Sequence, residues 1–72
     1  MISPQAFIAP GAKIGARVTI YPFAYIEDDV VIGDDCTIYP HVSLMNGTRI
    51  GQGNTIYQNA VLGASPQDFT WQ

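Results

Sequence analysis

Isoleucine and leucine recur along this chain at every sixth position. The series runs unbroken through Ile2, Ile8, Ile14, Ile20, Ile26, Ile32, Ile38, Leu44, Ile50, Ile56 and Leu62. Four residues after each member comes a second column, which is small or β-branched as far as Thr48 and more varied beyond it. A helix repeats its apolar face about every 3.6 residues and a half-buried strand about every 2, so neither explains a period of six.

A period of six suits a chain that turns a corner after each short strand. Three such hexads close a triangular coil of 18 residues, and residues 18 apart then stack at about 4.8 Å, the spacing of neighbouring strands. Four columns of like residues have this longer spacing: Gly15, Gly33 and Gly51; Thr19, Thr37 and Thr55; Tyr21, Tyr39 and Tyr57; Pro4, Pro22 and Pro40. Stacking of like on like is typical of a solenoid with in-register coils.

The pattern therefore predicts an all-β fold, a left-handed parallel β-helix shaped as a triangular prism. Residues 1–67 are assigned to the coils, because residues 2–67 hold eleven hexads, about three and two-thirds coils at three hexads each. Glycine is expected at corners that need a positive φ or a close approach of two backbones. Proline is expected at corners where no N–H has to donate to a neighbouring coil.

The repeat ends near the C-terminus of the chain. The next member of the series would be residue 68, which is Asp68, and residues 63–72 no longer follow the hexad rule. Residues 68–72 are therefore predicted to begin a loop that protrudes from the prism. Solenoids normally end in a cap, and no capping sequence follows the coils, so we expect the chain to be an N-terminal fragment of a longer protein.

Composition narrows the class of protein. The chain has 72 residues, of which 47% are hydrophobic and 12% charged, and this excludes disorder caused by low hydrophobicity. The net charge of −3, with only three basic residues, argues against a nucleic-acid-binding surface. The N-terminus lacks a secretory signal and Cys36 is the only cysteine, so a cytoplasmic location is expected.

Few residues are candidates for catalysis or metal binding. His41 is the only histidine, but no carboxylate in the neighbouring hexads is placed to orient it as a base, which favours a structural or surface role. One histidine cannot supply the ligands of a catalytic zinc, so no metal site and no cofactor are expected. Cys36 is interpreted as an inert core thiol. Five acidic residues are interpreted as solvent-exposed residues of the corners: Glu27, Asp28, Asp29, Asp34 and Asp35.

Two short motifs indicate a particular protein family. Residues 54–60 read Asn-Thr-Ile-Tyr-Gln-Asn-Ala, and residues 66–69 read Pro-Gln-Asp-Phe. Together with the opening Met-Ile-Ser-Pro, they resemble the signature of bacterial UDP-N-acetylglucosamine O-acyltransferases, which belong to the hexapeptide-repeat acyltransferase superfamily. The resemblance covers essentially all of the chain but less than a third of the usual family length.

The resemblance implies transfer of an (R)-3-hydroxyacyl group from acyl carrier protein to the 3-hydroxyl of UDP-N-acetylglucosamine, the first step of lipid A biosynthesis. It implies a homotrimer with active sites between subunits and a catalytic histidine on a later coil, so that this chain alone is expected to be inactive. By position, Gln67 and Asp68 match family residues that contact the sugar nucleotide or the acyl chain. Thr70 departs from the family pattern, which usually has a basic residue there.

Two other functions stay open on these grounds. One is a different hexapeptide acyltransferase, such as a CoA-dependent acetyltransferase. The other is a non-catalytic β-helix that serves as a scaffold or an oligomerisation module. The sequence beyond Gln72 would discriminate, because a histidine-rich coil followed by a short helical domain would favour the O-acyltransferase.

Overall fold

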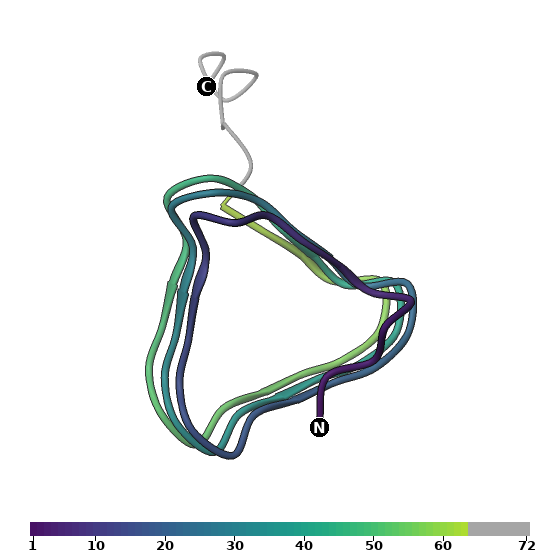
Figure 1. Ribbon diagram of the computed structural model, residues 1–72, viewed down its shortest axis with the longest axis horizontal. Helices are drawn as coiled ribbons and strands as arrows, with labels where there is room; N and C mark the ends of the chain where they lie inside the picture. Colours follow the sequence, from purple (N-terminus) through teal and green to yellow (C-terminus); the bar gives the residue numbers. More distant parts are fainter. Residues whose placement is uncertain (64–72) are drawn as a thin grey trace, which may run out of the picture.

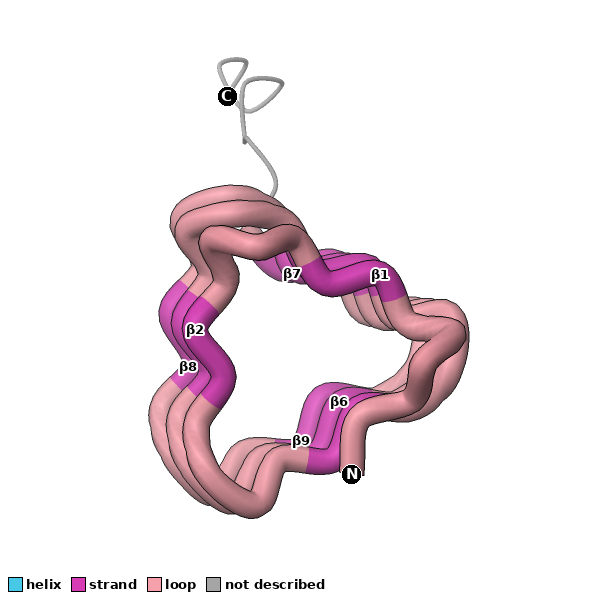
Figure 2. The backbone as a smooth tube through the Cα atoms, viewed as in Figure 1, coloured by secondary structure: helices cyan, strands magenta, loops and turns pink. Residues whose placement is uncertain are grey.

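The computed structural model describes residues 1–63 as a stack of triangular coils (Figure 1). Short strands form the three sides of the triangle and turns form its corners (Figure 2). Within residues 1–63 there are ten strands of two residues each: β1 (Phe7–Ile8), β2 (Lys13–Ile14), β3 (Thr19–Ile20), β4 (Tyr25–Ile26), β5 (Val31–Ile32), β6 (Thr37–Ile38), β7 (Ser43–Leu44), β8 (Arg49–Ile50), β9 (Thr55–Ile56) and β10 (Val61–Leu62).

Three parallel sheets form the three faces of the prism. Their strand orders are β1-β4-β7-β10, β2-β5-β8 and β3-β6-β9. The register pairs Ile8 with Ile26 and Ile20 with Ile38, so partners are 18 residues apart. The all-β fold and the parallel β-helix predicted from the sequence are confirmed. The left hand of the coil stays a prediction, and residues 64–67 of the predicted coils lie outside the described residues.

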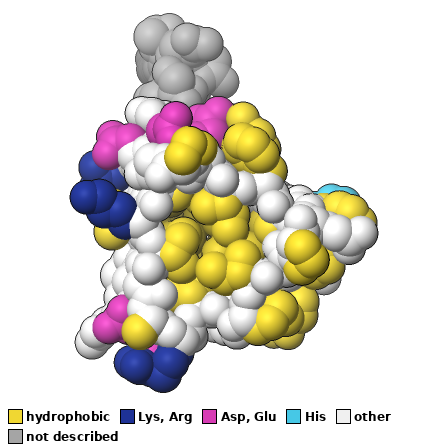
Figure 3. Space-filling view, in the orientation of Figure 1, with side chains coloured by type: hydrophobic (Ala, Val, Ile, Leu, Met, Phe, Trp, Pro, Cys, Tyr) yellow, Lys and Arg dark blue, Asp and Glu magenta, His cyan; other side chains and the backbone are white. Residues whose placement is uncertain are grey.

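The Ile/Leu series forms the core of the prism. Five members have no more than 1% of their surface exposed: Ile20, Ile26, Ile32, Ile38 and Leu44. Ile2, at the start of the first coil, is 46% exposed, because a side chain in a solenoid is covered only where a coil lies on both sides of it. Hydrophobic side chains accordingly fill the centre of the prism when it is viewed along the stack (Figure 3). In the part that the structure describes, no helix has the length and hydropathy that crossing a membrane requires.

Each corner is a four-residue turn at hexad positions two to five. In the first turn the Ala6 N–H donates to the Ser3 carbonyl at 3.1 Å. The third residue of the turn has a positive φ in eight corners: Arg17, Phe23, Asp29, Asp35, His41, Gly47, Gly53 and Asn59. Pro22 and Pro40 take the second turn position, so the arrangement matches a type II turn. Six of these residues are not glycine, although the left-handed region costs an ordinary residue about 1–2 kcal/mol.

In the column of Gly15, Gly33 and Gly51, the first two positions require glycine for lack of space and not for a positive φ. A Cβ placed on Gly33 would lie 2.7 Å from the Gln52 nitrogen and 2.8 Å from the Gly51 carbonyl carbon. Gly15 has the same relation to the coil that follows it, 2.8 Å from the Gly33 carbonyl carbon. Of the two roles that the sequence left open for these glycines, the close approach is therefore the one observed.

Acidic corner residues tie neighbouring coils together. Asp28 accepts a hydrogen bond from the Gly11 N–H at 2.8 Å, and Asp34 accepts one from the Ala16 N–H at 2.7 Å. The interpretation of this acidic group as solvated corners was therefore incomplete, since these two carboxylates take backbone donors of the preceding coil.

Within residues 1–63, two exposed ion pairs also join neighbouring coils. Arg17 pairs with Asp35 at 2.6 Å, and Arg49 pairs with Asp29 at 2.7 Å. The hydrogen bond from Arg17 lowers the pKa of the Asp35 carboxyl and raises the pKa of the guanidinium. All four side chains are more than half exposed, so each pair contributes little to the free energy of unfolding.

Replacing Gly33 with alanine should destabilise the β-helix, because the new Cβ would lie within 2.9 Å of three backbone atoms of the next coil. Overpacking of this kind costs about 1–3 kcal/mol, so the midpoint of thermal unfolding should fall by more than about 4 °C. Gly51→Ala is the matched control, since among residues 1–63 the nearest atom to its Cβ is 3.7 Å away. Its effect should stay within about 0.5 kcal/mol. Equal losses from both variants would show that the coils do not stack in this register.

Candidate functional site

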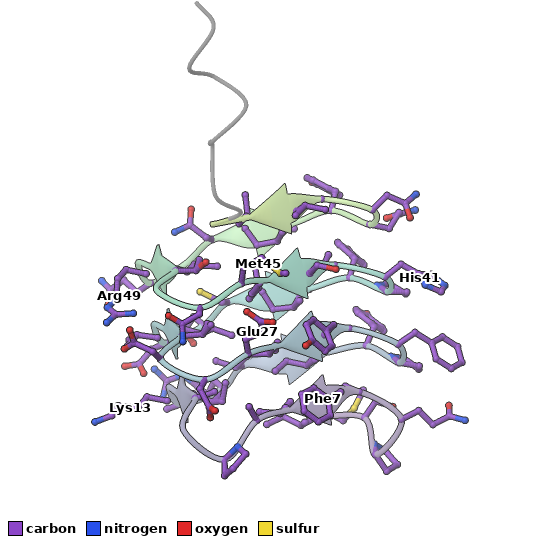
Figure 4. All side chains as sticks on the ribbon, turned by 90° about the horizontal axis from the view of Figure 1, so that it is seen from above. Phe7, Lys13, Glu27, His41, Met45 and Arg49 are labelled. Atoms are coloured by element: carbon purple, nitrogen blue, oxygen red, sulfur yellow. The ribbon has the colours of Figure 1, made fainter. Side chains whose placement is uncertain are left out.

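The corner that follows the β1-β4-β7-β10 sheet is the candidate functional site. We call it the Glu27 corner; it comprises residues 9–12, 27–30 and 45–48, with Gly63 at its last described level. In Figure 4, Glu27 lies directly below Met45, one coil away. At this corner Gly63 has a φ of 82° at the second hexad position, whereas eight other turns within residues 1–63 have their positive φ at the fourth.

The predicted substrate-binding residues Gln67 and Asp68 follow this point in the chain. Both lie outside the described residues, and so does Thr70. The sequence placed the loss of the hexad rule in residues 63–72. The first of them, Gly63, has a positive φ at a hexad position where the lower coils have none.

A shallow groove of about 290 Å³ lies beside the Glu27 corner. It is lined by Phe7, Ala9, Tyr25, Glu27, Asp28 and Asn46. The rings of Phe7 and Tyr25 stack with their centroids 5.2 Å apart, because the two residues occupy the same outward column 18 positions apart. The groove therefore has an aromatic wall formed by two coils and a polar rim formed by the corner.

Glu27 organises the polar rim of the groove. Its carboxylate accepts a hydrogen bond from the Tyr25 hydroxyl at 3.1 Å and another from the Asn46 N–H at 2.8 Å. The Asn46 side-chain amide donates in turn to the Asp28 carbonyl at 3.0 Å. The hydrogen bond to Glu27 raises the pKa of Tyr25, and the negative charge of Glu27 and partial burial act in the same direction.

The groove was not predicted from the sequence, although its signal was present. Phe7 and Tyr25 stand in one outward column, and Asp28 and Asn46 stand in one corner column, both with the spacing of 18. The pattern showed that these residues stack, but not that their side chains leave a hollow. The rim offers hydrogen-bond acceptors, and its Glu27 carboxylate is already engaged by Tyr25 and Asn46.

His41 lies at a different corner and has no catalytic arrangement around it. Its ring stacks on Phe23 with the centroids 5.4 Å apart, and its φ of 63° is that of a turn residue. Figure 4 shows it at the edge of the coils, away from Glu27. Among residues 1–63, no carboxylate forms a hydrogen bond with it. The structural or surface role expected for His41 agrees with this placement.

Cys36 lies in the core, 1% exposed, and its thiol donates to the Gly51 carbonyl at 3.1 Å. This agrees with the interpretation of Cys36 as a core thiol. Within the described range 1–63, no three histidine, cysteine or acidic side chains lie close enough together to hold a metal ion.

Comparison with known proteins adds an independent line of support. Residues 29–64 match the family described as bacterial transferase hexapeptide (six repeats). The fold is similar to the solved structure of UDP-N-acetylglucosamine acyltransferase from Campylobacter jejuni, with a TM-score of 0.92 and 32% sequence identity over 99% of this chain. The chain spans 28% of the length of that protein. No curated protein matches the sequence.

Removing the charge of Glu27 should lower the pKa of Tyr25 toward the ordinary value of a tyrosine, about 10. Because the pKa is raised in the folded chain, this contact stabilises the fold below pH 10 or so and is lost as the pH rises through the raised value. The measurement is a pH titration of ¹³C-labelled tyrosine by NMR in wild type and Glu27→Gln. Asp35→Asn is the control, and a Tyr25 titration curve unchanged by Glu27→Gln would contradict the hydrogen bond.

Proposed function

This chain belongs to the bacterial transferase hexapeptide family, and from its similarity to the Campylobacter jejuni enzyme we propose that it forms part of an O-acyltransferase that acts on a UDP-sugar. The resemblance suspected from the motifs at residues 54–60 and 66–69 is confirmed by the family match and by the similarity to the Campylobacter jejuni enzyme. The single observation that carries the proposal is the 32% identity to that enzyme over 99% of this chain.

In its specific form, the proposed reaction moves an (R)-3-hydroxyacyl group from acyl carrier protein to the 3-hydroxyl of UDP-N-acetylglucosamine, in the cytoplasm, as the first step of lipid A biosynthesis. A base removes the proton of the sugar hydroxyl, the hydroxyl oxygen attacks the thioester carbonyl, and the thiol of the carrier departs with a proton. We assign the base to a histidine beyond Gln72, because His41 stacks on Phe23 at another corner. The 72-residue chain alone should therefore show no transfer.

Gln67 and Asp68 are the residues of this chain that we propose contact the substrate. The support is the Pro-Gln-Asp-Phe motif at residues 66–69 and the positive φ of Gly63 shortly before it, at a hexad position where the lower coils have none. A carboxylate can accept hydrogen bonds from sugar hydroxyls at both oxygens, and this is the role proposed for Asp68. Gln67 would help to position the acylated substrate. Thr70 is uncharged, so it cannot form an ion pair with a phosphate group or with an acidic carrier protein.

Replacing Asp68 with alanine in the complete protein should lower kcat/KM for acyl transfer roughly ten- to a hundred-fold. The reason is that a hydrogen bond to a charged group is worth about 1.5–3 kcal/mol. Thermal stability should be nearly unchanged, because Asp68 is outside the hydrophobic series. Asp35→Asn is the control, since its ion pair with Arg17 is at another corner.

Wild-type kcat/KM for Asp68→Ala with several acyl-carrier donors would refute the site. Transfer from acyl-CoA to a different acceptor would point instead to a CoA-dependent acetyltransferase. Absence of any transfer by the complete protein would favour a scaffold or oligomerisation module.

We also propose a homotrimer, as the family resemblance implies. Large apolar side chains remain exposed in the single chain, among them Phe7 at 53%, Phe23 at 55% and Tyr57 at 67%. Clusters of such side chains are typical of surfaces that pack against another chain. The end coils also have strand edges that no coil of the described residues covers.

Analytical ultracentrifugation tests the trimer directly. One chain has a mass of 7.8 kDa, so a trimer has three times 7.8, or about 23 kDa. At tens of micromolar we expect the trimer to dominate. A sharp, concentration-independent monomer under these conditions would contradict the proposal.

A further inference from the structure

We propose that copies of this chain meet through one side of the prism, with a single corner turned toward the three-fold axis. That corner comprises residues 3–6, 21–24, 39–42 and 57–60, and we call it the aromatic corner. Together with its two flanking sheets, β1-β4-β7-β10 and β3-β6-β9, it forms what we call the uncharged side. The inference rests on the homotrimer of the proposed function, which leaves the contact surface open, and it assigns that surface.

Charge is distributed unevenly around the prism. Within residues 1–63, and with His41 counted as neutral, every charged side chain lies on the β2-β5-β8 sheet or on the two corners beside it: Lys13, Arg17, Glu27, Asp28, Asp29, Asp34, Asp35 and Arg49. The uncharged side has only the ammonium group of Met1, at its lowest level, which donates to the Val18 carbonyl at 2.8 Å. Figure 3 shows the charged side chains on the left-hand and upper parts of the prism and none at the right-hand corner, where the histidine lies.

Exposed apolar side chains have the opposite distribution. Within the described coils, seven large ones are at least 40% exposed, and all of them lie on the uncharged side: Met1, Ile2, Phe7, Phe23, Tyr25, Tyr57 and Val61. Outward side chains do not contribute to the core, so the fold itself does not require this segregation. A large exposed apolar surface without charges is typical of a surface that another macromolecule covers.

Stacking makes the aromatic corner rigid. The rings of Tyr21, Tyr39 and Tyr57 stack with their centroids 5.1 Å and 5.4 Å apart, and Phe23 stacks on His41 at 5.4 Å. Because each ring is held by a ring of the neighbouring coil, these side chains lose little conformational freedom when a partner covers them. Rigid aromatic side chains of this kind often supply most of the binding energy at the centre of an interface.

A second copy of this chain is the partner that the charges favour. The chain has a net charge of −3, and contact through the Glu27 corner would bring Glu27, Asp28 and Asp29 of two copies together. Like charges that face each other oppose association, whereas the uncharged side brings none together. A lipid surface fits less well, because anionic membranes attract Lys and Arg, and all three basic residues lie on the opposite side of the prism.

The two flanking sheets have unlike outward surfaces, which accounts for a ring of copies. One sheet has bulky outward side chains, among them Phe7 and Tyr25, and the other has the small column of Thr19, Thr37 and Thr55. A bulky surface fits against a small one, so each contact joins unlike faces of two copies. Contacts between unlike faces close into a ring when the rotation allows. With the aromatic corner toward the axis, each copy offers one face to each neighbour.

Gln58 and Gln52 form a matched pair for the test. Both are exposed, both are the second residue of a turn, and both belong to the same coil. Gln58 lies at the aromatic corner, whereas Gln52 lies at the corner between the β2-β5-β8 and β3-β6-β9 sheets. The experiment replaces each with glutamate and with lysine in the 72-residue chain and measures assembly by sedimentation equilibrium. Circular dichroism melting shows that each variant is folded, since exposed substitutions change stability little.

Both Gln58 variants should raise the protein concentration at which half of the chains are assembled by at least about ten-fold. The reason is that each variant places an unpaired charge from every copy in the contact. Both Gln52 variants should stay within about two-fold of wild type, because exposed charges away from a contact have small effects. Equal effects at the two positions would overturn the proposal. Opposite effects of lysine and glutamate at position 58 would also overturn it, because they would follow from the net charge alone.

Spin labels give a second, geometric test. Cysteines are placed at position 58 or 52 in a Cys36→Ala background, and pulsed electron paramagnetic resonance measures the distance between labels of different copies. The distance should be shorter at position 58 than at position 52, and the reverse order would place another corner at the axis. Trimers unaffected at position 58 would remove this surface and leave the trimer standing. A monomeric wild type would overturn both, and its cosedimentation with phosphatidylglycerol vesicles would assign the uncharged side to lipid. Acyl transfer by the complete protein is measured separately, so the proposed reaction stands or fails independently.

Discussion

In-register stacking of the coils is the interaction on which the rest of this structure depends. A two-residue strand has no stability of its own, so each strand exists only because a neighbouring coil supplies its hydrogen bonds and covers its inward side chain. Ile26 shows the effect, since it is fully buried between the side chains of Ile8 and Leu44. Ile8, in the first coil, is only half-buried although it belongs to the same column.

The same stacking gives the surface its properties. Residues 18 apart meet on the outside of the prism as they do inside it, which produces the Tyr21–Tyr39–Tyr57 ring stack and the Phe7–Tyr25 wall of the groove. Charged residues are joined between coils in the same manner, as Asp35 is to Arg17. Close coil spacing also has a cost, because at Gly33 it leaves no room for any side chain. A functional site on such a fold is therefore built from successive levels of one corner.

A regular prism repeats the same environment at every level, so a specific function needs a break in the repeat. Hexads of this kind are common to the whole hexapeptide family, and they determine the fold without selecting a substrate. The described coils depart from the repeat at the Glu27 corner, where Gly63, next to Thr48, has a positive φ that Ala9, Glu27 and Met45 lack. Binding residues concentrate in loops on a rigid scaffold, and the proposed function assigns substrate contacts to Gln67 and Asp68, which follow this point in the sequence.

The amino-acid sequence by itself determined the fold, the core and the register. The period of six identifies which residues point inward, and the period of 18 identifies which residues stack, and both are local consequences of strand and coil geometry. The motif around Gln67 and Asp68 indicated the family, but these two residues lie outside the described range 1–63. Only the tertiary structure showed that Arg17 and His41 adopt a positive φ, because that depends on how a closed coil completes its corner. Likewise, the groove at Tyr25 and Glu27 and the donors taken by Asp28 and Asp34 arise from the short distance between coils. A periodic pattern specifies which residues are neighbours, whereas the contact between two particular side chains follows from their shapes and from the backbone spacing that brings them together.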